Sequence, residues 1–318
     1  MKHIFFSLLI TLSVMLCSDV VYSEDKVYRF QDVKEINGIM HEVKTNKPIN
    51  GIVKRYYASG KLNTLIPFNK GKIDGIGKTY YESGKLKDEL PYIDNNKEGV
   101  GKTYYESGKL KYEIPYKNGK IEGVSKIYYE NGILRDEILY INDKIEGIGK
   151  VYYDSGILNE IISYTNDKKE GIAEIYYESG KLNTEIPYTN DKREGISKKY
   201  FESGKLYVEI IFKNDKREVI SKKYYESGIL NEELPFKNDK IEGIYKIFSE
   251  SDKLMDEIPY KNDKREGFGK KYYKSGKLYV EIIYKDDKGV SGYIYEDNGK
   301  KTEMTNAHLH EINKNIQH

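Results

Sequence analysis

The sequence predicts an all-β protein, an elongated single-layer antiparallel β-meander of about 22 strands that twists into a trough and has no globular core. Three observations lead to this fold class. A segment of 24 residues is repeated ten times between Gly51 and residue 290, without insertion or deletion. Each copy holds two short runs rich in Tyr and Ile, bounded by Gly, Asn, Asp or Ser. No segment sustains a helical period.

The opening glycine fixes the frame of the repeat. Nine of the ten copies begin with it, and Val219 takes its place in the eighth copy. A fixed period of this length is typical of repeat arrays, in which each unit contacts only its neighbours. We therefore expect function in an extended surface and not in a single pocket. The nine glycines are Gly51, Gly75, Gly99, Gly123, Gly147, Gly171, Gly195, Gly243 and Gly267.

One repeat has the pattern of a β-hairpin, and its first turn predicts a register. In the third copy, Glu106-Ser107-Gly108 is expected to be a three-residue loop, a type I turn followed by Gly in the left-handed region. Such a loop places Tyr104 opposite Leu110 and Val100 opposite Ile114. The leucine and two aromatic positions recur in every copy, so we expect a core face and an outer face. The core face would hold Val100, Tyr104, Leu110, Ile114 and Tyr116, and the outer face Tyr105, Lys109, Lys111, Glu113 and Pro115.

The same register predicts charged pairs across the strands on the core face. Opposite charges in this arrangement contribute roughly 0.2–1 kcal/mol each, so they help to fix the register. We favour a row of partly exposed ion pairs over a site for a charged ligand. The predicted pairs are Lys78–Asp88, Lys126–Asp136, Lys150–Glu160, Lys222–Glu232 and Lys246–Asp256.

The second turn of each copy is rich in Asn and Asp. It reads Asn118-Gly119 in one copy and Asn142-Asp143 or Asn190-Asp191 in others, and these residues tolerate left-handed conformations. No copy supplies the bidentate carboxylate of a known calcium loop, so turn chemistry explains these residues and calcium is not expected. A proline near the end of the second strand in six copies predicts a regular bend. These prolines are Pro67, Pro91, Pro115, Pro187, Pro235 and Pro259.

The chain is expected to divide into four parts. Residues 1–23 have a charged start, an apolar run and a polar end, typical of a signal peptide for export to the periplasm, the cell surface or the medium. Residues 24–50 form an N-terminal capping hairpin, 51–290 the ten repeats, and 291–318 a degenerate C-terminal cap and tail. Cys17 is the only cysteine. Because Leu16 before it is not small, no lipid anchor is expected there.

The repeated motif resembles a known family. The pattern G-x-x-K-x-Y-Y-x-S/N-G-K-L-x-x-E-I-x-Y-x-N-G/D-K-x-E, seen for example from Gly123 to Gly132, is similar to the bacterial variant of the MORN repeat. The resemblance covers about residues 36–300, and Val219 and Ser251-Asp252 depart from it. It implies an elongated sheet of hairpins that acts as a scaffold or binding surface. Some bacterial members are described as antitoxins, and eukaryotic relatives are associated with membrane attachment.

The sequence argues against an enzyme, a cofactor and a metal. The repeats contain no histidine, and His308, His310 and His318 lie in the tail, outside the repeated frame. The carboxylates recur from copy to copy, which is typical of a solvated face and not of one tuned acid–base pair. Net charge is +2 with Lys and Glu interleaved, so no basic surface for nucleic acid is expected.

The leading hypothesis is an exported, non-enzymatic protein that offers a binding or scaffold surface to a protein partner. Tyr presents a rigid area with a polar tip, and it is favoured at interfaces. A second tyrosine beside each first turn is the candidate binding surface, although these rings could equally cover a single-layer sheet. The candidates are Tyr57, Tyr81, Tyr105, Tyr129, Tyr153, Tyr177, Tyr225 and Tyr273.

Three alternatives stay open at this point. The chain could neutralise a partner toxin as an antitoxin or immunity protein, and an export signal would then favour a toxin outside the cytoplasm. It could attach to a membrane surface, since Tyr and Lys suit the interface. Two arrays could also pair edge to edge. The sequence does not decide which face binds, or what the partner is.

Overall fold

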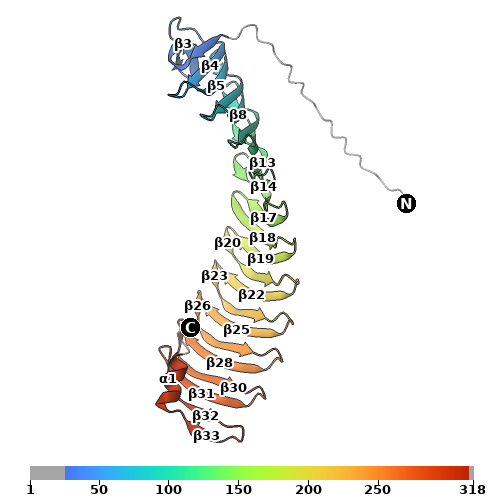
Figure 1. The fold of residues 1–318 in the computed structure, drawn as a ribbon, viewed down its shortest axis with the longest axis vertical. Helices are drawn as coiled ribbons and strands as arrows, with labels where there is room; N and C mark the ends of the chain where they lie inside the picture. Colours follow the sequence, from blue (N-terminus) through green and yellow to red (C-terminus); the bar gives the residue numbers. More distant parts are fainter. Residues whose placement is uncertain (1–25, 315–318) are drawn as a thin grey trace, which may run out of the picture.

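The ten repeats form one continuous sheet. The computed structural model describes residues 26–314, so the predicted signal peptide with Cys17, and His318, lie outside the described residues. One sheet of 31 strands runs the length of the molecule, and a separate two-stranded hairpin lies at its N-terminal end (Figure 1). The predicted all-β, elongated meander without a globular core is confirmed. One element was not predicted, the C-terminal helix α1 (Asn306–Lys314).

Each copy contributes two long strands, and most add a short one. Copies are numbered from Gly51. The first strands are β4 (Gly51–Tyr56), β7 (Gly75–Tyr80), β10 (Gly99–Tyr104), β13 (Gly123–Tyr128), β16 (Gly147–Tyr152), β18 (Lys168–Tyr176), β21 (Gly195–Tyr200), β24 (Val219–Tyr224), β27 (Gly243–Phe248) and β30 (Gly267–Tyr272). The second strands are β5 (Leu62–Asn69), β8 (Leu86–Ile93), β11 (Leu110–Lys117), β14 (Leu134–Ile141), β17 (Leu158–Thr165), β19 (Leu182–Thr189), β22 (Leu206–Lys213), β25 (Leu230–Lys237), β28 (Leu254–Lys261) and β31 (Leu278–Lys285).

The short strands raise the number above the 22 that the sequence predicts. They are β6 (Lys72–Ile73), β9 (Asn96–Lys97), β12 (Lys120–Ile121), β15 (Lys144–Ile145), β20 (Lys192–Arg193), β23 (Lys216–Arg217), β26 (Lys240–Ile241) and β29 (Lys264–Arg265). Each begins the return strand after the second turn of its copy, which is Asn-Asp or Asn-Gly except at Lys70-Gly71 and Asp94-Asn95, and the opening residue of the next copy then bends the chain. In the opening residue Gly123, φ is +114°, and a Cβ there would lie 3.2 Å from Cγ of Pro115. Glycine is therefore favoured at the bend, and Val219 adopts φ +65° at a cost.

A β-bulge in every copy corrects the predicted register. The three-residue loop is present, with Gly108 at φ +91°, and Tyr104 pairs with Leu110 as predicted. The register then shifts by one residue between Thr103 and Tyr104, so Val100 pairs with Pro115 and Gly101 with Ile114. The predicted pairing of Val100 with Ile114 is wrong. Because side chains alternate along a strand, the shift separates Ile114 and Tyr116 from Val100, Tyr104 and Leu110, and the predicted core face is divided between the two sides.

The bulge also moves the charged pairs by one residue and to the opposite face. Each lysine lies opposite the residue that follows the predicted Asp or Glu in the second strand. The predicted pairing is therefore wrong in all five copies. The observed register pairs are Lys78–Glu89, Lys126–Glu137, Lys150–Ile161, Lys222–Glu233 and Lys246–Glu257. Two of these five pairs are ordinary exposed ion pairs, 3.1 Å between Lys78 Nζ and Glu89 Oε1 and 3.8 Å between Lys126 Nζ and Glu137 Oε1.

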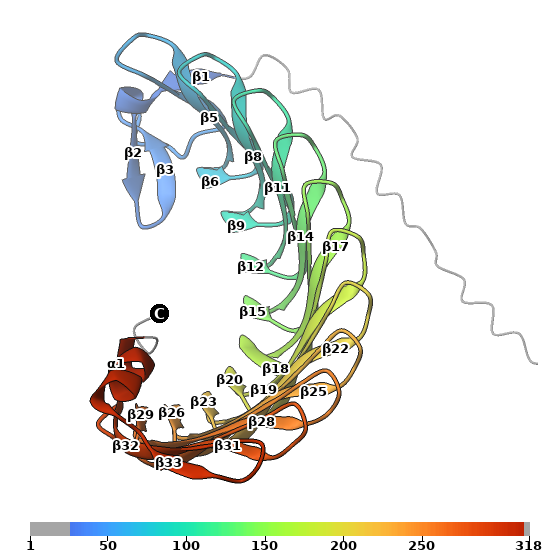
Figure 2. The same cartoon turned by 60° about the horizontal axis from the view of Figure 1, so that its bottom comes forward.

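The sheet curves into a crescent with a concave and a convex face (Figure 2). The concave face is built around the third residue of each copy, which is Gly, Ala or Ser in eight of the ten copies, with an aromatic ring over it. In copy 3, a Cβ on Gly101 would lie 3.1 Å from Cε2 of Tyr116 and 2.7 Å from Cδ1 of Leu90. Gly149 and Tyr164 repeat the arrangement, with 3.1 Å between the equivalent atoms. The rings therefore pack down onto the backbone, which gives a single layer its main buried contact.

The chain covers the concave face at both ends of the array. At the N-terminus, β1 (Val27–Arg29) pairs parallel to β4, and a 3₁₀ turn, η1 (Phe30–Asp32), leads to the hairpin of β2 (Val33–Ile36) and β3 (Ile39–Glu42). At the C-terminus, β32 (Lys288–Tyr295) and β33 (Lys301–Glu303) end the sheet. Helix α1 then turns back, and Figure 2 shows it and the β2–β3 hairpin on the inner side of the crescent.

The substitution Gly101→Val should lower the free energy of unfolding by about 1–3 kcal/mol, because the added atoms collide with Leu90 and Tyr116. Urea unfolding followed by circular dichroism measures the loss. Ser125→Ala is the matched control at the same place in copy 4, since its buried hydroxyl has no hydrogen-bond partner within residues 26–314 and copy 6 already carries Ala173 there. Equal midpoints for Gly101→Val and the unsubstituted protein would contradict the packing described.

Candidate binding trough

The concave face between the two capped ends forms a long groove, which we call the trough. Positions are counted from the opening residue, so copy 3 places Gly101 at position 3, Thr103 at 5, Tyr112 at 14, Ile114 at 16 and Tyr116 at 18. Residues at these five positions line the trough in copies 2 to 9. Position 16 is Ile or Leu and position 18 is Tyr or Phe in all ten copies. At positions 16 and 18 the bed of the trough is therefore uniform, aliphatic and aromatic.

Positions 5 and 14 are different, because they vary from copy to copy. They lie opposite each other and alternate along the trough, as Thr103 and Tyr112 do in copy 3. Position 5 reads Arg55, Thr79, Thr103, Ile127, Val151, Ile175, Lys199, Lys223, Ile247 and Lys271. Position 14 reads Thr64, Asp88, Tyr112, Asp136, Glu160, Thr184, Val208, Glu232, Asp256 and Val280. We call these residues the variable row. The predicted register put Thr103 and Tyr112 on opposite faces, so sequence reasoning did not find this row.

The variable row changes in charge along the array. In the N-terminal half it carries Asp88, Asp136 and Glu160 and no lysine. Asp88 accepts hydrogen bonds from the hydroxyls of Thr79, at 2.5 Å, and Thr103, at 2.7 Å, beside a cavity of 330 Å³. In the C-terminal half, Lys223 contacts Glu232 at 2.9 Å. Lys271 contacts Asp256 at 2.7 Å in the same way. Different parts of one groove thus present different chemistry.

Cations at position 23 in five of the ten copies lie along one rim of the trough. Each cation lies over the aromatic ring at position 18 of the following copy, at a distance typical of cation–π contacts. The guanidinium carbons of Arg193 and Arg217 lie 4.1 Å from the ring centroids of Phe212 and Phe236, one copy further on. The ammonium groups of Lys97 and Lys169 lie 4.8 Å and 5.2 Å from the centroids of Tyr116 and Tyr188. In each pair the ring belongs to the copy after that of its cation.

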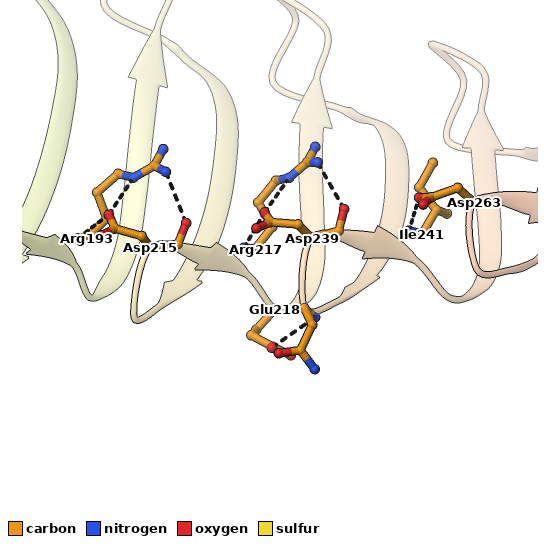
Figure 3. A network of polar contacts seen from close by, with 8 residues as sticks. Arg193, Asp215, Arg217, Glu218, Asp239, Ile241 and Asp263 are labelled. Atoms are coloured by element: carbon orange, nitrogen blue, oxygen red, sulfur yellow. Dashed lines mark hydrogen bonds and ion pairs between the residues drawn. The ribbon is translucent and has the colours of Figure 1, made fainter.

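The Asn-Asp turns bind the copies together at this rim (Figure 3). The backbone N–H of Ile241 donates to Oδ1 of Asp263 at 2.7 Å, and Arg193 donates to Asp215 from both its backbone and its side chain. The backbone N–H of Asn238 donates to Glu218 at 3.0 Å, from one copy to the previous one. These bonds account for the recurrence of Asn, Asp and Glu in the turns. Among the described residues, no group of three or more His, Cys, Asp or Glu is placed to hold a metal ion.

The eight candidate tyrosines have a structural role. Each hydroxyl donates to a backbone carbonyl one copy further along, as Tyr105 does to Tyr128 at 2.7 Å. Lys111 lies 5.2 Å from the ring centroid of Tyr105 and 5.1 Å from that of Tyr112, so these tyrosines flank the variable row. Their contact with a partner stays a prediction. The other seven bonds run from Tyr57 to Tyr80, Tyr81 to Tyr104, Tyr129 to Tyr152, Tyr153 to Tyr176, Tyr177 to Tyr200, Tyr225 to Phe248 and Tyr273 to Tyr295.

The convex face carries a second tyrosine row that is bonded to glutamates. The hydroxyl of Tyr128 donates to Glu113 of the previous copy at 2.8 Å. Burial and this carboxylate raise the pKa of Tyr128 to about 12. Ile161 replaces the glutamate in copy 5, and Tyr176 then donates to Glu174 of its own strand, which also raises the pKa of Tyr176 to about 12. The loss of one partner is thus compensated by a carboxylate from the other strand.

Exposed apolar side chains follow the convex face at position 2. Ile148 is 57% exposed and Phe268 is 72% exposed. We call this set the convex row, and it consists of Ile76, Val100, Val124, Ile148, Ile172, Ile196, Ile244 and Phe268. Contiguous exposed apolar groups of this kind mark interaction surfaces. In the described part of the chain, no helix is long and apolar enough to cross a membrane.

Comparisons with known proteins identify the repeat. A family model described as the MORN repeat variant matches residues 49–70, 73–94, 97–118, 121–142, 145–166, 169–190, 193–214, 217–238, 241–262 and 265–286. No curated protein matches the chain. One similar solved structure is virginiamycin B lyase from Staphylococcus aureus, at 14% identity over 79% of this chain and 82% of that chain, with a TM-score of 0.16. A TcdB2–TccC3 structure matches at 11% identity over 83% of this chain and 18% of that chain, with a TM-score of 0.18. Scores this low carry no argument about fold or function.

Alkaline pH should destabilise the array. The pKa of Tyr128, Tyr200, Tyr224 and Tyr272 is raised to about 12 in the folded state, while an unfolded tyrosine titrates near about 10. The unfolded chain therefore loses protons first, so this stabilisation is complete below about pH 10 and is lost as the pH rises through about 12. Urea unfolding at increasing pH, with tyrosinate absorbance as a second readout, measures the effect. Tyr128→Phe should reduce the slope, and an unchanged slope in that variant would contradict the assignment.

Proposed function

The chain belongs to the MORN repeat variant family, and we propose that it is a non-enzymatic binding protein whose trough holds an apolar segment of a partner protein. A binding or scaffold role follows from a MORN array as such. Which face binds, and what it binds, are the substance of the proposal. One observation carries it, namely that the chain itself fills the trough at both of its ends.

At the N-terminal end, the β2–β3 region lies on the bed of copy 1. Met40 and the buried Val33 and Ile49 pack against Val53 and Phe68, which occupy positions 3 and 18. The backbone also contributes a hydrogen bond, since the N–H of Met40 donates to the carbonyl of Gly71 at 2.7 Å. The same bed that stays open in copies 2 to 9 is thus a binding surface for an apolar hairpin.

At the C-terminal end, a helix lies on the bed of copy 10. Leu309 and Ile312 of α1, together with the buried Met304, pack with Ile282 and Tyr284 at positions 16 and 18. Asn313 of α1 accepts a hydrogen bond from the backbone N–H of Gly289 at 2.7 Å. Gly289 is at position 23. In other copies the backbone N–H at position 23 donates to the Asp in the turn of the next copy, as that of Ile241 does to Asp263. The helix therefore covers the bed of copy 10 and also supplies the hydrogen bond that a following copy would make.

Burial of apolar side chains drives both contacts. Each fully buried Leu, Ile or Met contributes about 1.5–3 kcal/mol, so a segment with three or four such side chains could bind the open trough with useful affinity. A helix or a hairpin would both suit it, since the chain uses one of each. The aromatic rings and the variable row flank the bed on either side, and they would give the contact its specificity.

The rest of the proposal concerns the location of the protein, the kind of partner and the absence of catalysis. We place the protein outside the cytoplasm because of the signal-peptide pattern in residues 1–23. A toxin is one partner that would fit such a protein, and growth rescue on co-expression with a neighbouring toxin gene separates this case from a general scaffold. The absence of an enzymatic role rests on the carboxylates of the variable row, which in copies 2, 8 and 9 have hydroxyl or lysine partners.

A second candidate function is attachment to a membrane surface, which the convex row favours. Its half-exposed Ile and Val side chains, with Phe268 most exposed, alternate with the Lys–Glu pairs of the same face. Such a face could lie on a headgroup region, although the near-neutral charge gives little attraction to anionic lipid.

A photocrosslinking amino acid at position 151 should trap the partner, because Val151 lies in the middle of the trough between Asp136 and Glu160. The matched control is the same amino acid at position 150, since Lys150 is the neighbouring residue on the convex face. Crosslinking is done in the native cells, and mass spectrometry identifies the product. Products from position 150 alone, or the same products from both positions, would place the contact elsewhere and overturn the trough proposal.

Membrane attachment predicts that the protein sediments with vesicles of phosphatidylcholine and phosphatidylserine, and that Phe268→Asn weakens this binding. The reason is the exposure of Phe268, which makes it the first side chain to enter an interface. Val151→Asn in the trough is the control and should leave sedimentation unchanged. A protein that stays in the supernatant at low salt removes this candidate.

A further inference from the structure

One cavity in the trough is lined by a lysine, Lys199, that has no matching carboxylate among the described residues. It lies at the junction of copies 6 and 7 and has a volume of 320 Å³. Its polar lining includes Thr184, Arg193, Ser197 and Lys199. Its walls are apolar, from Ile210 and the side chains around it. No Asp or Glu is among the residues that line it.

Ser197 and Lys199 are the two groups with unused hydrogen-bonding capacity. Ser197 is only 8% exposed, and its hydroxyl has no hydrogen-bond partner in the described range 26–314. Such a buried hydroxyl costs free energy unless a ligand satisfies it. Lys199 lies opposite Thr184 on one side and Val208 on the other, so neither neighbour in the variable row neutralises it. Within residues 26–314, no carboxylate lies within ion-pair distance of its ammonium group.

The equivalent lysines further along the array behave differently. Lys223 contacts Glu232 at 2.9 Å, and this hydrogen bond raises the pKa of Lys223. Lys271 contacts Asp256 at 2.7 Å. Glu232 is at position 14 of the same copy as Lys223, and Asp256 is at position 14 of the copy before Lys271. Lys199 has Val208 and Thr184 at these two places, and neither is a carboxylate. In the part of the chain that the structure describes, Lys199 is therefore the lysine of the variable row without a carboxylate partner, and a carboxylate of a ligand would complete the pair.

Arg193 shapes the cavity and is not free to bind. Its guanidinium lies 4.1 Å from the ring centroid of Phe212, and its Nη2 donates to the backbone carbonyl of Asp215 at 3.0 Å. Figure 3 shows the side chain held in this position against the turn of the next copy. Its Nε also pairs with the carboxylate of Asp215 at 3.2 Å, so its charge is compensated and Ser197 and Lys199 remain as the donors.

We propose that this cavity binds a carboxylate, the side chain of an Asp or Glu on the partner segment that lies in the trough. The inference rests on the proposed function and adds the chemistry of the partner. Two donors match the two oxygens of a carboxylate, one from the buried hydroxyl and one from the ammonium group. The apolar walls suit a carboxylate flanked by apolar residues on an amphipathic peptide, so an acidic amphipathic segment is the occupant.

The test is a selection of random linear peptides on the immobilised protein, followed by affinity measurements on the enriched sequences. We expect these sequences to share an Asp or Glu between apolar residues. Lys199→Gln should weaken their binding about tenfold, and Ser197→Ala about threefold, through the loss of one donor each. Affinity should also fall with added salt. Both variants should fold, because Lys199 is exposed and copy 6 carries Ala173 at the place of Ser197.

Lys205→Gln is the matched control, because it removes the same charge from an exposed turn of the same copy. It should leave binding unchanged. Enriched peptides without an acidic residue, or equal binding to Lys199→Gln, overturn the carboxylate site while the trough proposal stands. No enrichment at all overturns both. Binding of phosphatidylserine vesicles that Lys199→Gln abolishes, without peptide binding, would assign the cavity to lipid and overturn a peptide ligand.

Discussion

The β-bulge that follows the leucine of the second strand is the feature on which the rest of the structure depends. In every copy, one extra residue enters the second strand at this point, as Lys111 does between Leu110 and Tyr112. Everything beyond it changes face, because the side chains of a strand alternate. Without the bulge, Ile114 and Tyr116 would lie with Val100, and no small residue would lie beneath the ring of Tyr116. The concave bed follows from this single shift.

Much of the fold could be predicted from local chemistry. The period, the Gly-containing loop and the Asn-Asp turns are statements about residues near each other in sequence, and the structure has them where the pattern places them. The bulge has no such local marker. Lys111 occupies its extra position in copy 3, Tyr207 in copy 7 and Arg135 in copy 4, so no residue type identifies it. It is favoured only because the ring at position 18 then reaches the small residue at position 3, a contact between strands that the sequence shows only after the register is known.

The wrongly predicted register also hid the candidate site. In the predicted register the variable positions are divided between the two faces. Each face then appears uniform from copy to copy, and no site can be singled out on it. Once Thr103 and Tyr112 are known to face each other, the varying charges form one row beside the constant aliphatic and aromatic positions 16 and 18. The tyrosine row that the sequence did single out has its hydroxyls bonded to the next copy, as Tyr105 is to Tyr128. Its regularity is explained by the stability of the array, whatever else it contacts.

The two kinds of position follow different rules, and this difference is the physical basis for recognition in a repeat array. A residue on the bed is fixed by its neighbours, because a Cβ on Gly101 or a smaller ring at Tyr116 disturbs two copies. A residue in the variable row contacts mainly the residue across from it, so it can change when its partner changes, as Lys223 with Glu232 and Lys271 with Asp256 illustrate. Where the partner does not change as well, a charged side chain has no opposite charge to pair with. Lys199, which lies opposite Val208, is such a side chain. A groove that is constant in shape but uneven in charge can hold an apolar segment anywhere along its length. The uneven charge then selects one register for that segment, because any other register leaves a buried charge without a partner.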